Sequence, residues 1–515
     1  MNRVELERER EMTTGTQTQA SDLWSVFKAT AARVPSRVAV ETSDGTLTFE
    51  EVLAAAERLA ETFRGVGIES GSVVHVALPN GWEYLPVVLA LRSMDVVVGL
   101  VSSRYRDSEF QSVTSRMPPQ AFVVSSKMVE FLERALDVAE VHPVAGRAGE
   151  PSLALVVPTS STVRHAGPEG LAMVKFTSGS SGEPKGVGYV EQTLLAEARN
   201  VVSTLGIDES DRILVPVSVS HAYGFDLGLL PVIFAGARVV LRQGFIPREL
   251  LQDLAHPDTS VLLGVPSMYR ILADTEPSAL PDLSHIRYLL SATAQLPASL
   301  ALLCQERLGV AVCPFYGSSE AGAATIHVPA RMIERPDSVG VAVHGVEVRI
   351  LDSEGQPLPP GVEGEVAIRS QAVSRGYVTD EPGASKSFSR GKDGAVEYLT
   401  GDLGIIDDEG FLFLHGRLDR MINVGGLKVY PREVVNVLER CPCVSGARVV
   451  AGHDQAGEEF VRATVTLSQP TQEEDILVFC RRNLADFKVP RVIDIVESIT
   501  TPEAQKMSNL MGETS

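Results

Sequence analysis

Short apolar runs rich in β-branched residues alternate with helical patterns along most of this chain from Gly71 onward. In the first stretch we expect strands at residues 73–78, 96–101 and 122–125, with helices near residues 82–92 and 108–115. Beyond a Pro/Ser/Gly-rich segment at residues 150–170, further strands are expected at residues 212–215, 237–241, 260–264, 288–291 and 310–313. Because strands separated by helices pair in parallel and are covered by those helices, the alternation predicts an α/β fold with doubly wound sheets.

The pattern changes after about Val339. Hairpin-like strands at residues 346–351 and 364–369 predict a β-rich subdomain. A small α+β segment follows, with helices at residues 431–440 and 473–484 and strands at residues 447–451 and 461–467. A chain of 515 residues needs more than one core. We therefore expect a disordered lead-in at residues 1–20, a large N-terminal domain at residues 21–418 and a small mobile C-terminal domain at residues 419–515.

Charge and cysteine usage limit the partners of the chain. A net charge of -20 argues against nucleic acid as the main partner, because nucleic-acid binding draws on a basic surface. The five cysteines lack the paired spacing of a zinc site. The polar N-terminus has no secretory signal, and no apolar run is long enough to span a membrane. These features predict a cytoplasmic protein with no membrane insertion.

The candidate phosphate site is the loop Phe-Thr-Ser-Gly-Ser-Ser-Gly-Glu-Pro-Lys-Gly-Val at residues 176–187. Glycines let consecutive backbone N–H groups converge on an anion, hydroxyls add donors, and the lysine adds a positive charge. The contributing residues would be Thr177, Ser178, Gly179, Ser180, Ser181, Gly182 and Lys185. A Walker A loop is excluded because Pro184 precedes the lysine and Gly186 follows it. On composition alone, a flexible surface loop without a phosphate site is the alternative.

A second candidate site lies at the open end of an expected hairpin. Residues 403–406 and 411–414 read as its strands, with a turn at residues 409–410. Asp402 and Arg417 are nearly equidistant from that turn, so folding the hairpin brings them together. An acid suited to a ribose diol beside a guanidinium suited to phosphate makes a nucleotide clamp. A plain cross-strand ion pair is the alternative.

A third candidate, Tyr-Gly-Ser-Ser-Glu at residues 316–320, follows the expected strand at residues 310–313, where ligands bind in open α/β sheets. It offers an aromatic face for adenine, hydroxyls for a phosphate and one carboxylate for Mg²⁺. An ordinary polar loop is the alternative.

Taken in order, the segments at residues 176–187, 316–320, 398–402 and 416–433 resemble the signatures of the adenylate-forming (ANL) superfamily, which comprises acyl-CoA synthetases, adenylation domains and luciferases. The last two read Tyr-Leu-Thr-Gly-Asp and Gly-Arg-Leu-Asp-Arg-Met-Ile-Asn-Val-Gly-Gly-Leu-Lys-Val-Tyr-Pro-Arg-Glu. The resemblance spans roughly residues 20–510. It implies that a carboxylate attacks the α-phosphate of Mg-ATP to form an acyl-adenylate, and that a thiol then takes the acyl group.

The resemblance also implies roles for individual residues. The loop at residues 176–187 would hold the β- and γ-phosphates, and Tyr316 would flank the adenine, with Gly317 and Ser318 as further cofactor-binding residues. Ser319 would touch the α-phosphate and Glu320 would hold Mg²⁺. Asp402 would bind the ribose hydroxyls with Arg417 nearby, and Asp419 would be the hinge of the C-terminal domain. Gly425 and Gly426 would let a pantetheine arm pass close to the backbone.

The essential lysine of the family would be Lys506, which would bridge the carboxylate and the α-phosphate. Gln505 stands where the family usually has glycine, and Lys488 is the nearby competitor, which fits a strand-entry or surface position better. His221 would line the channel between carboxylate and thiol, although a lone histidine is more often structural.

The acyl pocket would be walled by Tyr223, Gly224, Phe225, Asp226, Met268, Ser291, Ala292 and Thr293. Ala292 replaces a glycine found in many relatives. Asp226 has two interpretations, because an aspartate in this neighbourhood binds the substrate ammonium in members that activate amino acids. We expect it instead to cap the N-terminus of a helix.

The sequence therefore predicts an AMP-forming acyl-CoA synthetase that uses ATP, Mg²⁺ and coenzyme A and acts on a hydrophobic or bulky carboxylic acid. One alternative is a stand-alone adenylation enzyme that loads an amino or β-amino acid onto the phosphopantetheine arm of a separate carrier protein. A second alternative is a degenerate member that binds nucleotide without turnover.

Overall fold

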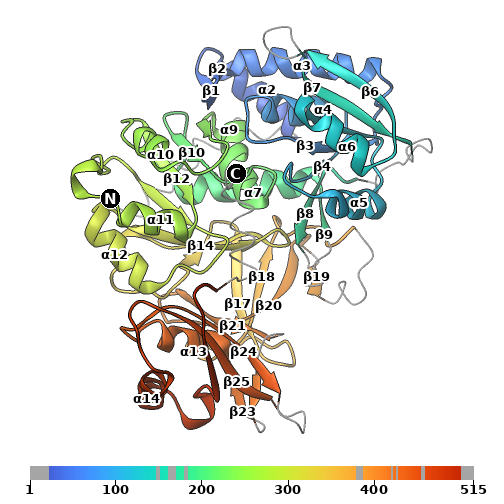
Figure 1. Cartoon of the computed structure of the whole chain (residues 1–515). Coiled ribbons are helices and arrows are strands. Elements are labelled where there is room, and N and C mark those ends of the chain that lie inside the picture. Colours follow the sequence, from blue (N-terminus) through green and yellow to red (C-terminus); the bar gives the residue numbers. More distant parts are fainter. Residues whose placement is uncertain are drawn as a thin grey trace.

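The computed structural model describes residues 22–145, 151–159, 170–178, 184–378, 387–391, 393–418, 422–424, 427–453 and 459–499 (Figure 1). The expected lead-in at residues 1–20 lies outside these residues. The predicted α/β fold class is confirmed. Two large mixed sheets with accompanying helices and a β-rich subdomain precede a small C-terminal α+β unit.

The first large sheet has seven strands in the order β6-β7-β5-β3-β4-β8-β9. Its centre, β5-β3-β4-β8, is parallel, and its edges are antiparallel. The strands are β3 Val73–Ala77, β4 Val97–Leu100, β5 Ala121–Ser125, β6 Val138–Ala145, β7 Pro151–Pro158, β8 Met173–Ser178 and β9 Pro184–Tyr189. The accompanying helices are α3 Phe49–Gly65, α4 Tyr84–Ser93, α5 Asp107–Arg116 and α6 Val129–Ala135. The strands and helices expected between residues 73 and 125 are confirmed within three residues at their ends.

The second large sheet has nine strands in the order β16-β15-β14-β13-β12-β10-β11-β1-β2. The strands are β1 Val38–Thr42, β2 Gly45–Thr48, β10 Arg212–Val215, β11 Arg238–Leu241, β12 Thr259–Gly264, β13 Tyr288–Ser291, β14 Val312–Ser318, β15 Gly322–Ile326 and β16 Val341–Ala342. The helices are α2 Leu23–Arg33, α7 Glu191–Leu205, α8 Ala222–Gly224, α9 Leu230–Ala235, α10 Pro247–Leu254, α11 Pro266–Ala273 and α12 Ala298–Leu308. One hydrophobic cluster joins both sheets through α2, α4, α7 and α9.

The strand expected at residues 310–313 continues to Ser318. Its second half pairs in antiparallel fashion with β15, which carries the chain on in extended form. Tyr316, Gly317 and Ser318 therefore lie within β14, so the alternative of an ordinary polar loop is wrong for these three residues.

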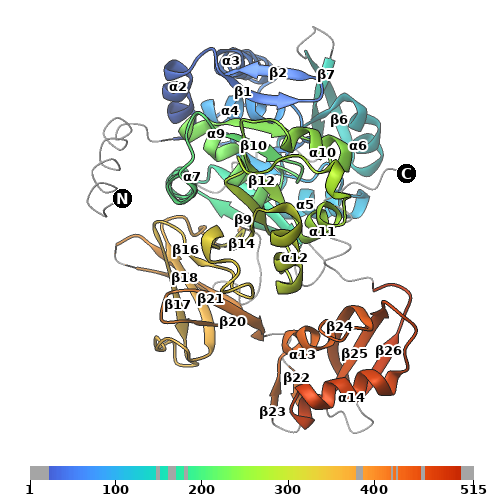
Figure 2. The same ribbon diagram turned by 90° about the vertical axis from the view of Figure 1, so that its left-hand side faces the viewer.

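The β-rich subdomain is an antiparallel sheet of five strands, in which β21 pairs with β20. Its strands are β17 Val346–Leu351, β18 Gly364–Ser370, β19 Phe388–Arg390, β20 Val396–Ile406 and β21 Leu412–Arg417. Figure 2 shows this sheet beside the C-terminal elements β22 Ile422–Val424, β23 Leu427–Val429, α13 Pro431–Leu438, β24 Val444–His453, β25 Glu459–Leu467, α14 Glu473–Asn483 and β26 Val492–Ile495. The C-terminal elements enclose a hydrophobic cluster of their own.

Short 3₁₀ turns complete the described structure at Ser126–Met128, Pro277–Ala279, Pro329–Arg331 and Asp486–Lys488. In the part of the chain that the structure describes, every helix is too short or too polar to cross a bilayer.

Candidate functional site

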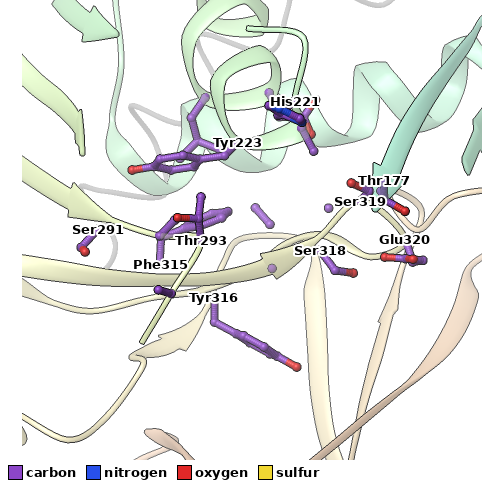
Figure 3. A pocket seen from close by; sticks show the side chains of 18 of the residues that line it. Thr177, His221, Tyr223, Ser291, Thr293, Phe315, Tyr316, Ser318, Ser319 and Glu320 are labelled. Atoms are coloured by element: carbon purple, nitrogen blue, oxygen red, sulfur yellow. The ribbon is translucent and has the colours of Figure 1, made fainter. Parts of the chain in front are cut away.

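A cavity of about 550 Å³ opens where the carboxyl end of the nine-stranded sheet faces β8 and β21. Figure 3 shows two groups of side chains along it: Thr177, Ser319 and Glu320 gather at one end, and Tyr223, Phe315, Ser291 and Thr293 lie at the other. The predicted site residues that line it are Thr177, His221, Tyr223, Asp226, Ser291, Ala292, Thr293, Tyr316, Gly317, Ser318, Ser319, Glu320 and Arg417. Segments far apart in sequence are thus brought to one place.

The candidate phosphate loop joins two antiparallel strands, β8 and β9, in which Thr177 lies opposite Lys185. Cross-strand partners point to the same face of a sheet, so the hydroxyl and the ammonium emerge together. The far edge of β9 is bonded to residues 375–378, which approach closely because a side chain at Gly186 or Gly188 would meet Val378. The loop thus connects two strands that are hydrogen-bonded to each other, and the second of them is also bonded to residues 375–378.

Tyr377 contacts both Glu320 and Lys185, a role that sequence reasoning missed. Its hydroxyl donates a hydrogen bond to Glu320 Oε1 at 2.7 Å, and Lys185 Nζ lies 5.4 Å from the centre of its ring. Burial raises the pKa of Tyr377, which keeps the hydroxyl protonated as a donor. Nothing in the local sequence Ser-Arg-Gly-Tyr-Val distinguishes this tyrosine from a packing residue.

The predicted meeting of Asp402 and Arg417 is confirmed. The two residues are cross-strand partners in the β20–β21 hairpin, and Arg417 Nη1 lies 3.3 Å from Asp402 Oδ1. Tyr316 donates its hydroxyl to Asp402 Oδ2 at 2.6 Å. Gly401 adopts a φ of 73°, and a Cβ there would lie 3.1 Å from Arg417 Nη2. The hairpin therefore presents an aromatic ring, a carboxylate and a guanidinium together.

The other end of the cavity is aromatic. The rings of Tyr223 and Phe315 lie 5.4 Å apart, and the Tyr223 hydroxyl donates to the Leu290 carbonyl at 3.0 Å. Ser291 Oγ is buried, with no hydrogen-bond partner among the described residues. Thr293 has a φ of 70°, which is strained for a β-branched residue. Strained backbone of this kind clusters at ligand sites.

The predicted cap by Asp226 is wrong. Asp226 lies in a π-helical turn, Phe225–Leu229, inside a continuous helical stretch that begins at α8, so it is not at a helix N-terminus. Its carboxylate instead accepts a hydrogen bond from Lys175 Nζ of β8 at 2.5 Å. Both side chains are almost fully buried, with 4% and 1% exposed.

The predicted pocket wall is also corrected at Gly224, Phe225 and Met268. None of these three is among the residues that line the cavity. Phe225 and Met268 are fully buried in the main hydrophobic cluster, because their helical faces turn toward the sheet. A side chain at Gly224 would collide with the backbone of residues 218–219, so this glycine permits a close packing of chain segments.

The Lys175–Asp226 pair belongs to a buried cluster with Glu197 of α7 and Tyr189 of β9. Lys175 Nζ lies 4.2 Å from the centre of the Tyr189 ring, and Tyr189 donates its hydroxyl to the Ser319 carbonyl. Glu197 Oε1 accepts a hydrogen bond from the Ala323 N–H at 2.8 Å. Burial, with the nearby charge of Asp226, raises the pKa of Glu197 to about 8.

Glu320 is the predicted Mg²⁺ ligand. Within the described residues, no group of three or more histidine, cysteine or acidic side chains is placed to hold a metal. A single carboxylate at a phosphate site nevertheless suits Mg²⁺, which takes most of its ligands from phosphate oxygens and water.

Several predicted residues lie outside the described residues: Gly179, Ser180, Ser181, Gly182, Asp419, Gly425, Gly426 and Lys506. Ser178 ends β8, but its side chain is not described. Lys488, the competitor of Lys506, donates to Glu433 Oε2 at 2.5 Å in a 3₁₀ turn.

Comparison with known proteins matches residues 27–378 to the family model "AMP-binding enzyme" and residues 433–505 to "AMP-binding enzyme C-terminal domain". The chain is 29% identical to a probable CoA ligase of Humulus lupulus, with 93% of each chain covered. It is 29% identical to a medium-chain fatty-acid–CoA ligase of Escherichia coli, with 95% of this chain and 89% of the relative covered. The o-succinylbenzoate CoA synthetase of Bacillus subtilis, solved with its acyl-adenylate, superimposes with a TM-score of 0.79 at 25% identity, covering 96% and 98%.

Proposed function

Because the chain belongs to the AMP-binding enzyme family, we propose that it is an ATP-dependent acyl-CoA synthetase for a hydrophobic or bulky carboxylic acid. In the first step the carboxylate attacks the α-phosphate of ATP, which forms an acyl-adenylate and releases pyrophosphate. In the second step the thiol of CoA attacks the acyl carbon and releases AMP. The thiol proton leaves to solvent or a nearby base.

One observation carries this proposal: a single cavity joins phosphate-binding chemistry to an aromatic pocket. Thr177, Ser319 and Glu320 stand at one end, and the Tyr223–Phe315 pair stands at the other (Figure 3). A carboxylate between these groups would meet the α-phosphate while its acyl chain packs on the rings. Holding both reactants in place removes much of the entropic barrier.

The residues of the chain have distinct roles in this proposal. Lys185 and the hydroxyls of its loop hold the departing pyrophosphate, and Ser319 donates to the α-phosphate. Asp402 accepts from the ribose hydroxyls, with its carboxylate oriented by Tyr316 and Arg417. Glu320 would hold Mg²⁺, which neutralises charge on the phosphates.

Most of the remaining roles rest on residues outside the described part of the chain, and one rests on the described His221. Lys506 bridges the carboxylate and the α-phosphate, and the C-terminal domain rotates at Asp419 between the two steps. Gly425 and Gly426 let the pantetheine arm pass, and His221 lines its channel. The acceptor is CoA, or the phosphopantetheine arm of a separate carrier protein. A cytoplasmic location fits the five buried free thiols.

The first test is pyrophosphate release from ATP with a panel of aromatic, fatty and amino acids, followed by addition of CoA. We expect release with bulky acids and an acyl-CoA product. Acids that are adenylated but yield thioester only with a phosphopantetheinylated carrier would make the carrier the acceptor. No pyrophosphate with any acid would leave the binding-only alternative standing.

The assignment of the two lysines can be tested in parallel. Lys506→Ala should abolish adenylation and leave ATP binding largely intact, whereas Lys488→Ala, the matched control, should lose its contacts with Glu433 and Phe487 and keep adenylation. Lys185→Ala should weaken ATP use more than thioester formation from a preformed adenylate, because it removes leaving-group binding. Near-normal adenylation by Lys506→Ala would assign the bridging role to another residue.

A further inference from the structure

The cavity has a polar corner that the proposed reaction does not use. Glu197 and Asp226 both line the cavity, and both side chains are almost completely buried, with 3% of each residue exposed. Glu197 Oε2 has no hydrogen-bond partner among the residues that the structure describes. A buried carboxyl oxygen without a partner is costly, because desolvation is not repaid. Such an atom at a cavity wall indicates a partner that arrives with a ligand.

The hydrogen bond that Glu197 makes within the protein does not require a carboxyl group. Its Oε1 anchors the turn after Glu320 by accepting the Ala323 N–H, which a glutamine carbonyl would do equally well. The nearby cation, Lys175, is already committed to Asp226 at 2.5 Å and to the ring of Tyr189. Among the described residues, the corner therefore has two carboxyl groups but one ammonium, and no group donates to Glu197 Oε2.

The carboxyl group of Glu197 packs against Gly322, which has a φ of 72°. A Cβ at this position would collide with Glu197 Oε2, so the glycine makes room for this carboxyl group at the cavity wall. The raised pKa of Glu197, about 8, means that the corner holds a proton where a cation would otherwise be. An incoming ammonium group supplies both the hydrogen bond and the missing charge.

We propose that Glu197 is a specificity-determining residue that binds an amino group on the acyl substrate, so that the enzyme prefers bulky acids that carry an amine. This inference rests on the proposed function, since it names the substrate class of the same cavity. The aromatic wall of Tyr223 and Phe315 binds the body of the acid, and the corner at Glu197 selects its donor group.

The test uses the full chain and matched acids that differ in one group: amino, hydroxyl or methyl, on a linear series of graded length and on a benzoate. The readout is kcat/KM for pyrophosphate release. In each series, we expect kcat/KM for the best amino-substituted acid to exceed that of the matching methyl-substituted acid by about 10- to 100-fold. This is the range expected for a hydrogen bond to a charged group. The hydroxyl partner should fall between them.

Glu197→Gln should bring the amino-to-methyl ratio of kcat/KM close to one, chiefly by lowering the value for the amino-substituted acid, because the carboxamide still accepts from Ala323 but carries no negative charge. Glu191→Gln is the matched control on the same helix, since Glu191 pairs with Arg92 away from the cavity. This control should keep the wild-type ratio. A purely structural Glu197 would lower all rates together.

If Glu197→Gln does not fold, calorimetry on the wild-type protein decides: binding of the amino acid, but not of the methyl acid, should release a proton near neutral pH. Equal use of amino and methyl acids by the wild type, or an unchanged ratio in Glu197→Gln, would overturn this inference and leave the acyl-CoA synthetase standing. Absence of pyrophosphate with every acid would overturn both.

Discussion

At the scale of single residues, three tyrosines hold the residues that we propose act on the nucleotide. Tyr377 orients Glu320 and lies against Lys185, Tyr316 orients Asp402, and Tyr189 holds the Ser319 carbonyl. Each of these tyrosines fixes a residue that we propose binds the nucleotide or its Mg²⁺. Precise placement of this kind depends on the shell that supports the reacting groups.

Tyr377→Phe removes the hydrogen bond to Glu320 while keeping the ring beside Lys185. We expect about a tenfold fall in kcat/KM for pyrophosphate release, with a larger deficit at limiting Mg²⁺, because a hydrogen bond to a charged group is lost. A Mg²⁺ titration of the initial rate checks this. Tyr288→Phe, on β13 and outside the cavity lining, should behave as wild type; equal losses in both variants would argue against a role for Tyr377.

Asp226→Asn leaves the Lys175 ammonium buried without its counter-ion. Breaking one partner of a buried pair costs about 3–5 kcal/mol, far more than the loss of a helix cap. Urea unfolding should show this drop in the free energy of unfolding. The double variant Lys175→Met/Asp226→Leu removes both charges and should recover most of the stability. A loss below about 1 kcal/mol in Asp226→Asn would mean that Lys175 finds another partner.

At the scale of secondary-structure elements, the central strands of the seven-stranded sheet are buried on both faces, and one of them carries a histidine. His75 of β3 packs edge-on against Phe122 and Phe176, 5.3 Å and 5.4 Å from the two ring centres. Gly99 on the neighbouring strand makes room for the imidazole, since a Cβ there would collide with it. Neither ring nitrogen has a hydrogen-bond partner in the described residues.

Burial lowers the pKa of His75 from 6.5 to about 3, so the native chain keeps it neutral. The unfolded chain binds a proton below pH 6.5, and stability is therefore full above that pH and is lost as the pH falls toward 3. The expected slope is about 1.4 kcal/mol per pH unit. Urea unfolding between pH 7 and 5 should show this dependence reduced in His75→Leu; identical slopes would show that His75 is protonated in the native state.

The elements themselves were largely predictable, whereas contacts between distant elements were not. Asp402 and Arg417 could be paired from sequence because one hairpin sets their register. Lys175 and Asp226 are 51 residues apart on a strand and a helix, and the sequence around Asp226 imitates a helix start. Glu197 and Tyr377 have no local signature, because their roles arise only when α7 and residues 375–378 pack beside the turn at Ser319.

At the scale of the whole molecule, the hydrophobic cores divide near the predicted domain boundary. Three clusters use residues up to Leu412, and the fourth lies within residues 422–493. The cavity is lined by residues from Ser102 to Arg417. The N-terminal part therefore holds nearly all described groups proposed for nucleotide binding, whereas Lys506 belongs to the C-terminal part.

A chain that ends after Leu418 should fold and bind ATP but release no pyrophosphate, since it keeps its cores and the Asp402–Arg417 pair and lacks Lys506. Cooperative thermal unfolding, with a higher Tm in the presence of ATP, checks the first part of this expectation. The full chain with Lys506→Ala is the control for catalysis. A fragment that unfolds without a transition would place the domain boundary elsewhere.

The three sheets that meet at the cavity divide its walls among themselves. The β8–β9 hairpin and the β20–β21 hairpin carry the residues that we propose bind the nucleotide, whereas Tyr223, Ser291 and Phe315 belong to the nine-stranded sheet and its helices. Substitutions among the residues of the aromatic end can thus change the acid that is bound without changing the two hairpins. Laboratory evolution toward new acids should accordingly enrich substitutions at Ala222, Tyr223, Leu227 and residues 291–296, which line the cavity, and purge them at residues 173–178 and 402–417.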